Sequence, residues 1–267
     1  MNRMLIGALA GALAAVLLVP GAVRGQEQEF SGDTLQWRQA MQAGSWLRVR
    51  NMNGEVSVEG TTGNTAEVVG IKRYRRADPE DVRFVVIKEG NDVTICALWG
   101  DRSTCTIDDY RANWRGEGRD DISVDFTVKL PRGVKVLASS VNGAVDVMGA
   151  TAEVEAATVN GRVEVSTSTG PVSATTVNGG VLARMATLPS AADMHFTTVN
   201  GSVRVVVPAE FDADIEMSTV NGRLRTDFPI TVSGRIDPKR LSAKIGKGGR
   251  RVTMKTVNGS IDLEKQS

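Results

Sequence analysis

Apolar and polar residues alternate in short runs along most of this 267-residue chain. In the clearest run, residues 122–130, every second side chain is apolar, and Pro131-Arg132-Gly133 ends the run as a turn. A period of two is typical of a β-strand that buries one face. Comparable runs begin at Trp46 and recur to the C-terminus, whereas no stretch of the sequence keeps an apolar period of 3.6 residues. The pattern predicts an all-β protein.

A four-residue motif, Thr or Ser followed by Val-Asn-Gly, occurs six times in the second half of the chain. The copies begin at Ser140, Thr158, Thr176, Thr198, Thr219 and Thr256. Successive steps are 18, 18, 22, 21 and 37 residues, so the last step equals about two of the others. A fixed period near 20 residues is the mark of a repeat architecture, in which one structural unit stacks on the next.

An earlier Asn-Gly pair follows the run at Trp46, so the chain carries seven such pairs. We assign all of them a structural role as repeat positions. They are Asn53, Gly54, Asn142, Gly143, Asn160, Gly161, Asn178, Gly179, Asn200, Gly201, Asn221, Gly222, Asn258 and Gly259.

The repeat allows two folds. Asn-Gly between strands is a strong hairpin signal, because a type I′ turn needs positive φ at both central residues, and this interpretation gives an antiparallel β-sandwich of hairpins. A hairpin, however, does not require Thr-Val before Asn-Gly, whereas stacked coils place identical residues above one another, where asparagines bond along the stack. A rung of 18 residues, at roughly 3.3 Å per residue, has a perimeter of about 60 Å, which suits three short sides. We therefore predict a right-handed parallel β-solenoid, or β-helix, with Thr-Val-Asn-Gly corners, and keep the sandwich as the alternative.

The N-terminus has the features of a secretory signal peptide. Residues 5–19 are an apolar run that ends at Pro20, and Val23-Arg24-Gly25 offers small residues at the cleavage positions. The run is about 15 residues, shorter than the roughly 20 that span a bilayer. A retained membrane anchor is the alternative. We expect residues 1–25 to be removed, leaving no membrane span in a protein that is exported to the periplasm, the cell surface or the medium.

The mature chain divides by regularity rather than by linkers. Residues 26–45 are a polar lead-in, and residues 46–133 are a less regular β part with an excursion over residues 99–121. Residues 134–267 are the repeat β-solenoid, which we expect to continue the preceding part as one domain. The irregular segment 228–251 is expected to form part of a C-terminal cap.

The composition limits the classes of partner that the protein is expected to bind. The chain has 32 basic and 31 acidic residues, and this balance argues against a nucleic-acid partner, which needs a net basic face. Only two cysteines are present, Cys96 and Cys105. In an oxidising compartment we expect them to form a disulfide, since two thiols are too few for a metal site.

Catalytic signals are weak. His195, the only histidine, flanks Phe196 in a repeat strand, where a surface or satisfied side chain is favoured over a catalytic base. No glycine-rich phosphate-binding motif occurs. Acidic residues such as Asp146 and Glu164 are scattered along the repeat strands. The sequence therefore predicts no catalytic residue, no cofactor and no metal ligand.

Residues that depart from the repeat are the possible binding residues. They are Lys72, Arg73, Arg75, Arg76, Trp99 and Trp114. The basic run suits anionic envelope material such as lipid headgroups or acidic glycans, although lysine and arginine also protect strand edges. The tryptophans suit a loop that contacts a sugar or peptide, or one that packs onto the solenoid.

The chain resembles a bacterial putative-adhesin family of β-strand-repeat cell-envelope proteins, a domain of unknown function. The resemblance covers roughly residues 40–265. It rests on residues 47–56, the strand Val124-Asp125-Phe126-Thr127-Val128 leading into Pro131-Arg132-Gly133, the Val-Asn-Gly series and Gly246-Lys247-Gly248-Gly249. It implies a secreted or membrane-attached β-solenoid without catalysis. The loop between Cys96 and Cys105 is not part of the pattern.

The sequence thus predicts an exported, non-enzymatic, adhesin-like binding scaffold of the cell envelope, whose ligand is a glycan, a lipid or a protein. One alternative is an envelope-stress or signalling accessory that senses peptides or lipids through residues 72–76. Another is a carbohydrate-active enzyme on a β-helix, which a cluster of three or more acids on one face would favour.

Overall fold

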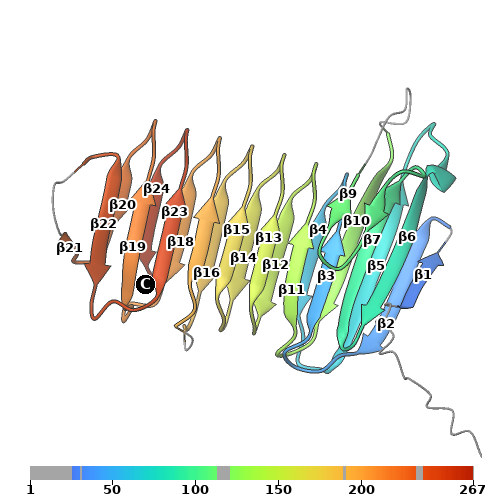
Figure 1. Cartoon of the computed structure of the whole chain (residues 1–267), viewed down its shortest axis with the longest axis horizontal. Helices are drawn as coiled ribbons and strands as arrows, with labels where there is room; N and C mark the ends of the chain where they lie inside the picture. The colour runs from blue at the N-terminus through green and yellow to red at the C-terminus, as the bar shows by residue number, and fades with distance from the viewer. Residues whose placement is uncertain (1–25, 31, 113–120, 189–190, 233–236, 267) are drawn as a thin grey trace, which may run out of the picture.

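The chain folds into two long, facing β-sheets (Figure 1). The computed structural model describes residues 26–30, 32–112, 121–188, 191–232 and 237–266. The expected signal peptide and Trp114 lie outside these ranges. Within them, one sheet (sheet A) has 12 strands and the other (sheet B) has 10.

Sheet A contains, in spatial order, β1 (Gln26–Phe30), β6 (Val82–Glu89), β7 (Asp92–Trp99), β3 (Trp46–Arg50), β11 (Lys135–Ser139), β13 (Val154–Ala157), β15 (Val172–Thr175), β17 (Met194–Thr197), β23 (Arg251–Lys255), β19 (Ala213–Ser218), β22 (Arg240–Ile245) and β21 (Thr231–Val232). Sheet B contains β2 (Thr34–Ala40), β5 (Thr65–Arg73), β10 (Ser123–Leu130), β4 (Val56–Gly60), β12 (Val145–Ala150), β14 (Val163–Thr167), β16 (Val181–Met185), β18 (Val203–Val207), β24 (Ile261–Lys265) and β20 (Leu224–Thr226). A small hairpin, β8 (Thr104–Cys105) with β9 (Tyr110–Arg111), and one 3₁₀ turn, η1 (Pro79–Asp81), complete the described elements.

The repeats form a parallel solenoid, as the sequence predicts. Each coil places one strand in sheet A and the next in sheet B, and equivalent strands pair in parallel; for example, β13 pairs with β15 and β14 pairs with β16. The alternative of an antiparallel sandwich of hairpins is therefore wrong for the repeats. The hand of the coil stays a prediction.

The prediction of three sides per coil is wrong, because each coil has two. In the coil from β13 to β14, strands of 4 and 5 residues are joined by the Thr-Val-Asn-Gly corner. The opposite turn, residues 168–171, leads directly into the next strand of sheet A. No residues remain for a third side.

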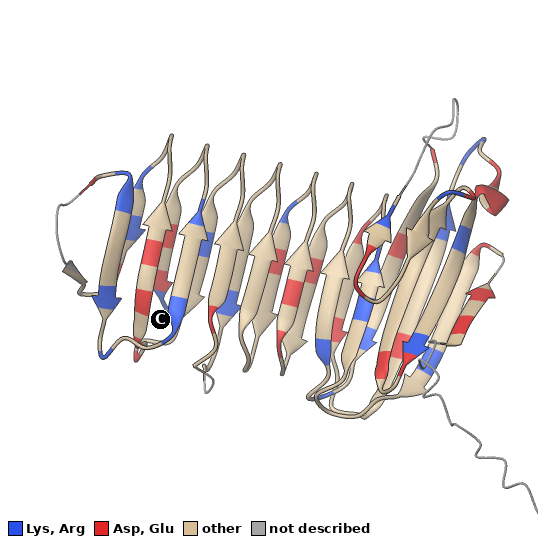
Figure 2. Cartoon of the chain, viewed as in Figure 1, with Lys and Arg blue, Asp and Glu red and all other residues tan. Residues whose placement is uncertain are grey.

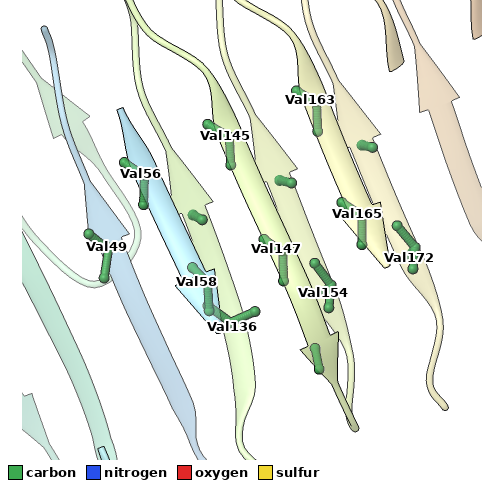
Figure 3. Close-up of a cluster of buried hydrophobic side chains, with 14 of the residues drawn as sticks. Val49, Val56, Val58, Val136, Val145, Val147, Val154, Val163, Val165 and Val172 are labelled. Carbon is green, nitrogen blue, oxygen red and sulfur yellow. The ribbon is translucent and has the colours of Figure 1, made fainter. Parts of the chain in front are cut away.

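Small β-branched side chains fill the space between the sheets. Val145, Val147 and Val163 of sheet B are at most 1% exposed and face Val154 and Val172 of sheet A (Figure 3). One continuous core runs from Leu35 to Leu263. β-branched residues suit strands that bury one face, and their uniform small size allows successive coils to stack at a constant spacing.

Both ends of the stack contain a coil inserted from elsewhere in the sequence. At the C-terminal end, β23 lies between β17 and β19, and β24 lies between β18 and β20. The last coil in sequence is therefore not the last in space, which explains the 37-residue step before Asn258. At the other end, β3 lies between β7 and β11, and β4 lies between β10 and β12.

The irregular segments also form strands. The lead-in supplies β1 and β2, which pair antiparallel with β6 and β5 at the N-terminal edges of the two sheets. In segment 228–251, β22 pairs antiparallel with β19, and β21 pairs with β22. Antiparallel strands therefore extend the parallel stack at the N-terminal ends of both sheets and at the C-terminal end of sheet A.

Candidate binding surfaces

The corner asparagines form a hydrogen-bonded ladder. Five of the six Nδ2 groups donate to the Oδ1 of the asparagine one coil away, at 2.7–2.8 Å. In space the ladder runs through Asn142, Asn160, Asn178, Asn200, Asn258 and Asn221. These amides lie on the edge of the solenoid and bond to one another from coil to coil.

The Thr or Ser of each corner has a role that the sequence reasoning missed. Its hydroxyl is buried and donates to the carbonyl of a corner glycine in the adjacent coil; Thr176 Oγ1, for example, donates to Gly161 O at 2.9 Å. All six copies make this bond, at 2.8–2.9 Å. The presence of Thr or Ser in every copy is the sequence signal from which such a bond could have been predicted.

The corner glycines allow the coils to approach closely. A Cβ atom on Gly179 would lie 1.9 Å from the carbonyl oxygen of Gly161, and one on Gly201 would lie 1.9 Å from that of Gly179. Contacts this short exclude any side chain. The glycine is therefore required by the stacking of coils, in addition to any demand of the turn.

The corner valines face outward. Val159, Val177, Val199 and Val257 are 37–40% exposed, and Val220 at the C-terminal end is 60% exposed. The edge of the solenoid is thus an uncharged row of valines beside the asparagine ladder.

Two of the six possible binding residues are buried within the fold. Trp99 is 1% exposed in the core, and Lys72 is 6% exposed. The Lys72 ammonium donates to Pro79 O at 2.8 Å, and burial lowers the pKa of its side chain. The structure therefore removes Trp99 and Lys72 from the possible binding residues.

The other possible binding residues are Arg73, Arg75, Arg76 and Trp114. Arg73 forms an ion pair with Asp125. Arg75 and Arg76 are exposed, and their binding role stays a prediction, as does the role of Trp114, which lies outside the described residues. The basic run therefore loses Lys72 to the fold and shares Arg73 with an acid.

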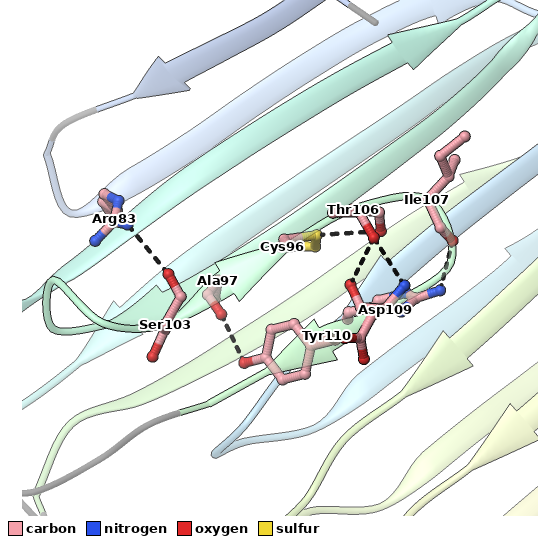
Figure 4. Close-up of a disulfide and its surroundings, with 10 residues drawn as sticks. Arg83, Cys96, Ala97, Ser103, Thr106, Ile107, Asp109 and Tyr110 are labelled. Carbon is pink, nitrogen blue, oxygen red and sulfur yellow. Dashed lines mark hydrogen bonds between the residues drawn. A yellow bond between two sulfur atoms is a disulfide. The ribbon is translucent and has the colours of Figure 1, made fainter. Parts of the chain in front are cut away.

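The predicted disulfide joins Cys96 of β7 to Cys105 of β8, and it fixes the excursion to the outer face of sheet A (Figure 4). Cys105 and Tyr110 pack on an apolar patch on that face. Tyr110 Oη donates to Ala97 O at 2.8 Å, and Arg50 Nη2 donates to Ile107 O at 2.7 Å. The described part of the excursion is thus packed onto the solenoid.

Three acids meet on the outer face of sheet B. Glu55, Asp146 and Glu164 come from neighbouring coils, and burial together with the Glu55 carboxylate raises the pKa of Asp146 to about 6. Arg162 lies 2.7 Å from Asp146, and Arg184 lies 2.7 Å from Glu164. A cluster of three acids on one face is the feature expected of a carbohydrate-active enzyme on a β-helix. Two of these three acids, however, are ion-paired with arginines.

A charged face lies near the C-terminal end of sheet A, over β23, β19 and β22 (Figure 2). The outward residues of these strands align in three rows, each written here in the order β23, β19, β22. The rows are Lys255, Ser218 and Arg240; then Thr253, Glu216 and Ser242; then Arg251, Asp214 and Lys244. Basic residues therefore occupy the four corners of this face.

Two hollows open on that face and share Ser242. One, of about 440 Å³, is lined by Glu216, Met217, Ser218, Arg240, Leu241, Ser242 and Lys255. The other, of about 410 Å³, is lined by Asp214, Ile215, Thr231, Ser242, Ala243 and Lys244. In the sequence this region is marked only by its basic residues, Lys239, Arg240, Lys244, Lys247, Arg250, Arg251 and Lys255. The alignment of the rows requires knowledge of which strands are neighbours.

The described residues contain no helix that is both long and apolar enough for a membrane crossing. Among the same residues, no group of three or more His, Cys, Asp or Glu side chains is arranged to hold a metal ion. His195 lies exposed on the outer face of β17, next to Ser173 and Thr253.

Comparison with known proteins finds one matching family model and several solved structures of low sequence identity. The model of the Toastrack DUF4097 family matches residues 111–264. A putative cell adhesion protein from Clostridium sporogenes is similar in structure, with 11% identity over 87% of this chain and 100% of that chain, at a TM-score of 0.44. A putative adhesin from Bacteroides fragilis has 9% identity over 88% and 98% of the two chains, at a TM-score of 0.35. No curated protein matches.

Proposed function

The chain belongs to the Toastrack DUF4097 family, and from that premise we propose that it is an exported, non-enzymatic, adhesin-like binding scaffold of the cell envelope. Its partner is a glycan, lipid or protein at the cell surface. It uses no cofactor and binds no nucleic acid.

One observation carries this proposal: the stack keeps its inside constant and varies its outside. Along sheet A the paired inward residues Val154, Val172, Met194, Val252 and Ile215 are all apolar and buried. The outward residues one position further along are Glu155, Ser173, His195, Thr253 and Glu216. Solenoids typically present such extended surfaces to their partners.

Enzymatic function is disfavoured by how the acids are used. A glycoside hydrolase needs one carboxyl group to donate a proton and another to act as base or nucleophile. Asp146 has the raised pKa of a proton donor, but Arg162 lies 2.7 Å from its carboxylate and Arg184 pairs with Glu164 at 2.7 Å, so both acids are engaged by arginines within the fold.

Export is supported by the disulfide and by the apolar N-terminal run. Disulfides persist mainly in oxidising compartments such as the periplasm and the cell exterior. Mass spectrometry of the protein recovered from its native cells tests this step. We expect the mature N-terminus near Gln26, with Cys96 and Cys105 linked; an intact N-terminus on a cytosolic protein with two free thiols would refute export.

The binding function is tested by incubating the purified protein with intact cells, isolated envelopes and surface polysaccharide fractions. Saturable binding to at least one fraction is expected. A matched control is the protein unfolded by denaturant and reductant, since a scaffold binds only when its coils are stacked. Absence of saturable binding to every fraction would contradict the proposal.

A further inference from the structure

The 440 Å³ hollow near the C-terminal end of sheet A has the arrangement of a site for an anion. Ser218 lies in register between Lys255 on one side and Arg240 on the other. Neighbouring strands lie about 4.8 Å apart, so the two cations start about 10 Å apart and can reach over the Ser218 hydroxyl from both sides. A carboxylate above Ser218 would meet both cations and the hydroxyl.

No acid stands between the two cations of this row. Ser218 replaces the acid that stands between the two cations of the third row, where Asp214 lies between Arg251 and Lys244. Lys255 has one ion pair, with Glu216 at 3.3 Å. The Arg240 guanidinium has no ion pair or hydrogen bond among the residues that the structure describes. An exposed arginine without a partner, at the edge of a hollow, is suited to bind a carboxylate through two hydrogen bonds.

The adjacent row adds a second requirement. Glu216 and Ser242 line the same hollow and lie two residues along their strands from Ser218 and Arg240. Two residues of strand span roughly 7 Å, about the length of one sugar ring. The Glu216 carboxylate accepts hydrogen bonds from hydroxyl groups and repels a second negative charge.

We propose that this hollow binds a uronic acid residue of an acidic polysaccharide. The sugar carboxylate lies between Arg240 and Lys255 above Ser218, and the ring hydroxyls donate to Glu216 and bond with Ser242. A bare phosphate or a phospholipid headgroup would satisfy the cations but not Glu216. This inference rests on the proposed binding function, for which it names a site and a ligand class.

Calorimetric titration of the full chain with a tetrasaccharide of galacturonic acid tests the proposal. Two matched probes accompany it: the methyl-esterified tetrasaccharide, which has lost its charges, and inorganic phosphate, which has no hydroxyl-bearing ring. We expect measurable binding of the acidic tetrasaccharide and at least tenfold weaker binding of both other probes. Equal binding of the esterified form, tighter binding of phosphate, or no binding of the tetrasaccharide would overturn the proposal.

Variants then locate the site. Arg240→Ala is expected to weaken tetrasaccharide binding at least tenfold. Arg204→Ala removes the same charge from the outer face of sheet B, where Arg204 pairs with Glu264, and should change binding less than twofold. If both variants weaken binding equally, the attraction is one of overall charge and the site is refuted.

Glu216→Gln separates a sugar site from a simple anion site. It is expected to weaken tetrasaccharide binding at least threefold and to strengthen phosphate binding, whereas a simple anion site would bind both probes more tightly. The same variants assayed on whole envelopes distinguish the two proposals. Saturable envelope binding that Arg240→Ala leaves unchanged would retain the scaffold function and reject this site, whereas no envelope binding at all would reject the scaffold function itself.

Discussion

The middle coils and the N-terminal part build the same kind of corner with different residues. In the middle, a Thr hydroxyl bonds a glycine carbonyl and each asparagine bonds the next asparagine. At the N-terminal corner, Asn51 replaces Thr, and its Nδ2 lies 3.1 Å from Gly54 O and 2.7 Å from Val124 O. Asn53 Nδ2 donates to Ile122 O at 2.7 Å rather than to another side chain.

The difference shows how a solenoid ends its ladder. A stack of identical corners leaves its last coil with unpaired groups that would template further strands. Here the longer Asn51 side chain reaches the glycine carbonyl and also strand β10, which covers the first coil. The middle therefore depends on repetition, and the N-terminal part depends on contacts that occur once.

The largest expected effect comes from breaking the repetition at a corner glycine. Gly179→Ala places a Cβ 1.9 Å from Gly161 O, so the coils must separate. We expect a loss of about 3 kcal/mol or more in the free energy of unfolding, measured by denaturant titration. Gly63→Ala is the matched control in the N-terminal part, because a Cβ there meets nothing within 4 Å. A similar loss in both variants would refute the close-approach argument.

The N-terminal part should instead depend on its disulfide. Replacing Cys96 and Cys105 together by alanine removes the link between β7 and β8. The chain-entropy argument predicts a loss of about 2–3 kcal/mol in unfolding free energy. Hydrogen exchange should locate the loss in β6 to β9, while β13 to β16 keep their protection. Uniform loss of protection along the stack would show that the two regions unfold as one unit.

The next largest effect is expected from removing the hydrogen bond of one corner hydroxyl. Thr176→Val keeps the shape of the side chain but removes the bond to Gly161 O, and a buried carbonyl that loses its donor costs about 1–2 kcal/mol. Val177→Thr is the control next to it, because Val177 is 37% exposed and should change stability by less than about 0.5 kcal/mol. Thermal unfolding of the two variants measures the contrast, and equal shifts would mean that the hydroxyl is not used.

The sequence predicts the middle better than the ends for a physical reason. Repeated Thr-Val-Asn-Gly determines the register between neighbouring coils, because each corner pairs with an identical one. The number of sides depends on strand and turn lengths, which the spacing alone does not separate. The sequence does not reveal that the coil of β23 and β24 is inserted between two others, because its corner motif is the same as theirs.

The sequence predicts the candidate binding face only in part, for a related reason. Arg240, Lys255 and Ser218 come from three strands whose order in space differs from their order in sequence. Charge runs therefore suggested the region but not the arrangement. Lys72 illustrates the opposite error: it belongs to a basic run in the sequence, yet the strand alternation turns its side chain inward.

The smallest expected effect is a pH dependence at the junction of the two regions, where Glu55 of the first coil meets Asp146 of the second. Burial raises the pKa of Asp146 from 3.8 to about 6, so between these values the folded chain holds a proton that the unfolded chain releases. Stability from this group is therefore lost as pH rises from about 4 to 6.

The melting temperature of Asp146→Asn should accordingly rise relative to the unmodified chain between pH 4 and 6 and then stay level, because asparagine carries no charge to desolvate. Thermal melts across that range measure the difference. Glu55→Gln should move the midpoint of the change to lower pH, since it removes a neighbouring carboxylate that raises the pKa of Asp146. A difference that is constant with pH would mean that folding does not raise the pKa of Asp146, and an unchanged midpoint in Glu55→Gln would mean that the first coil does not contribute to the shift.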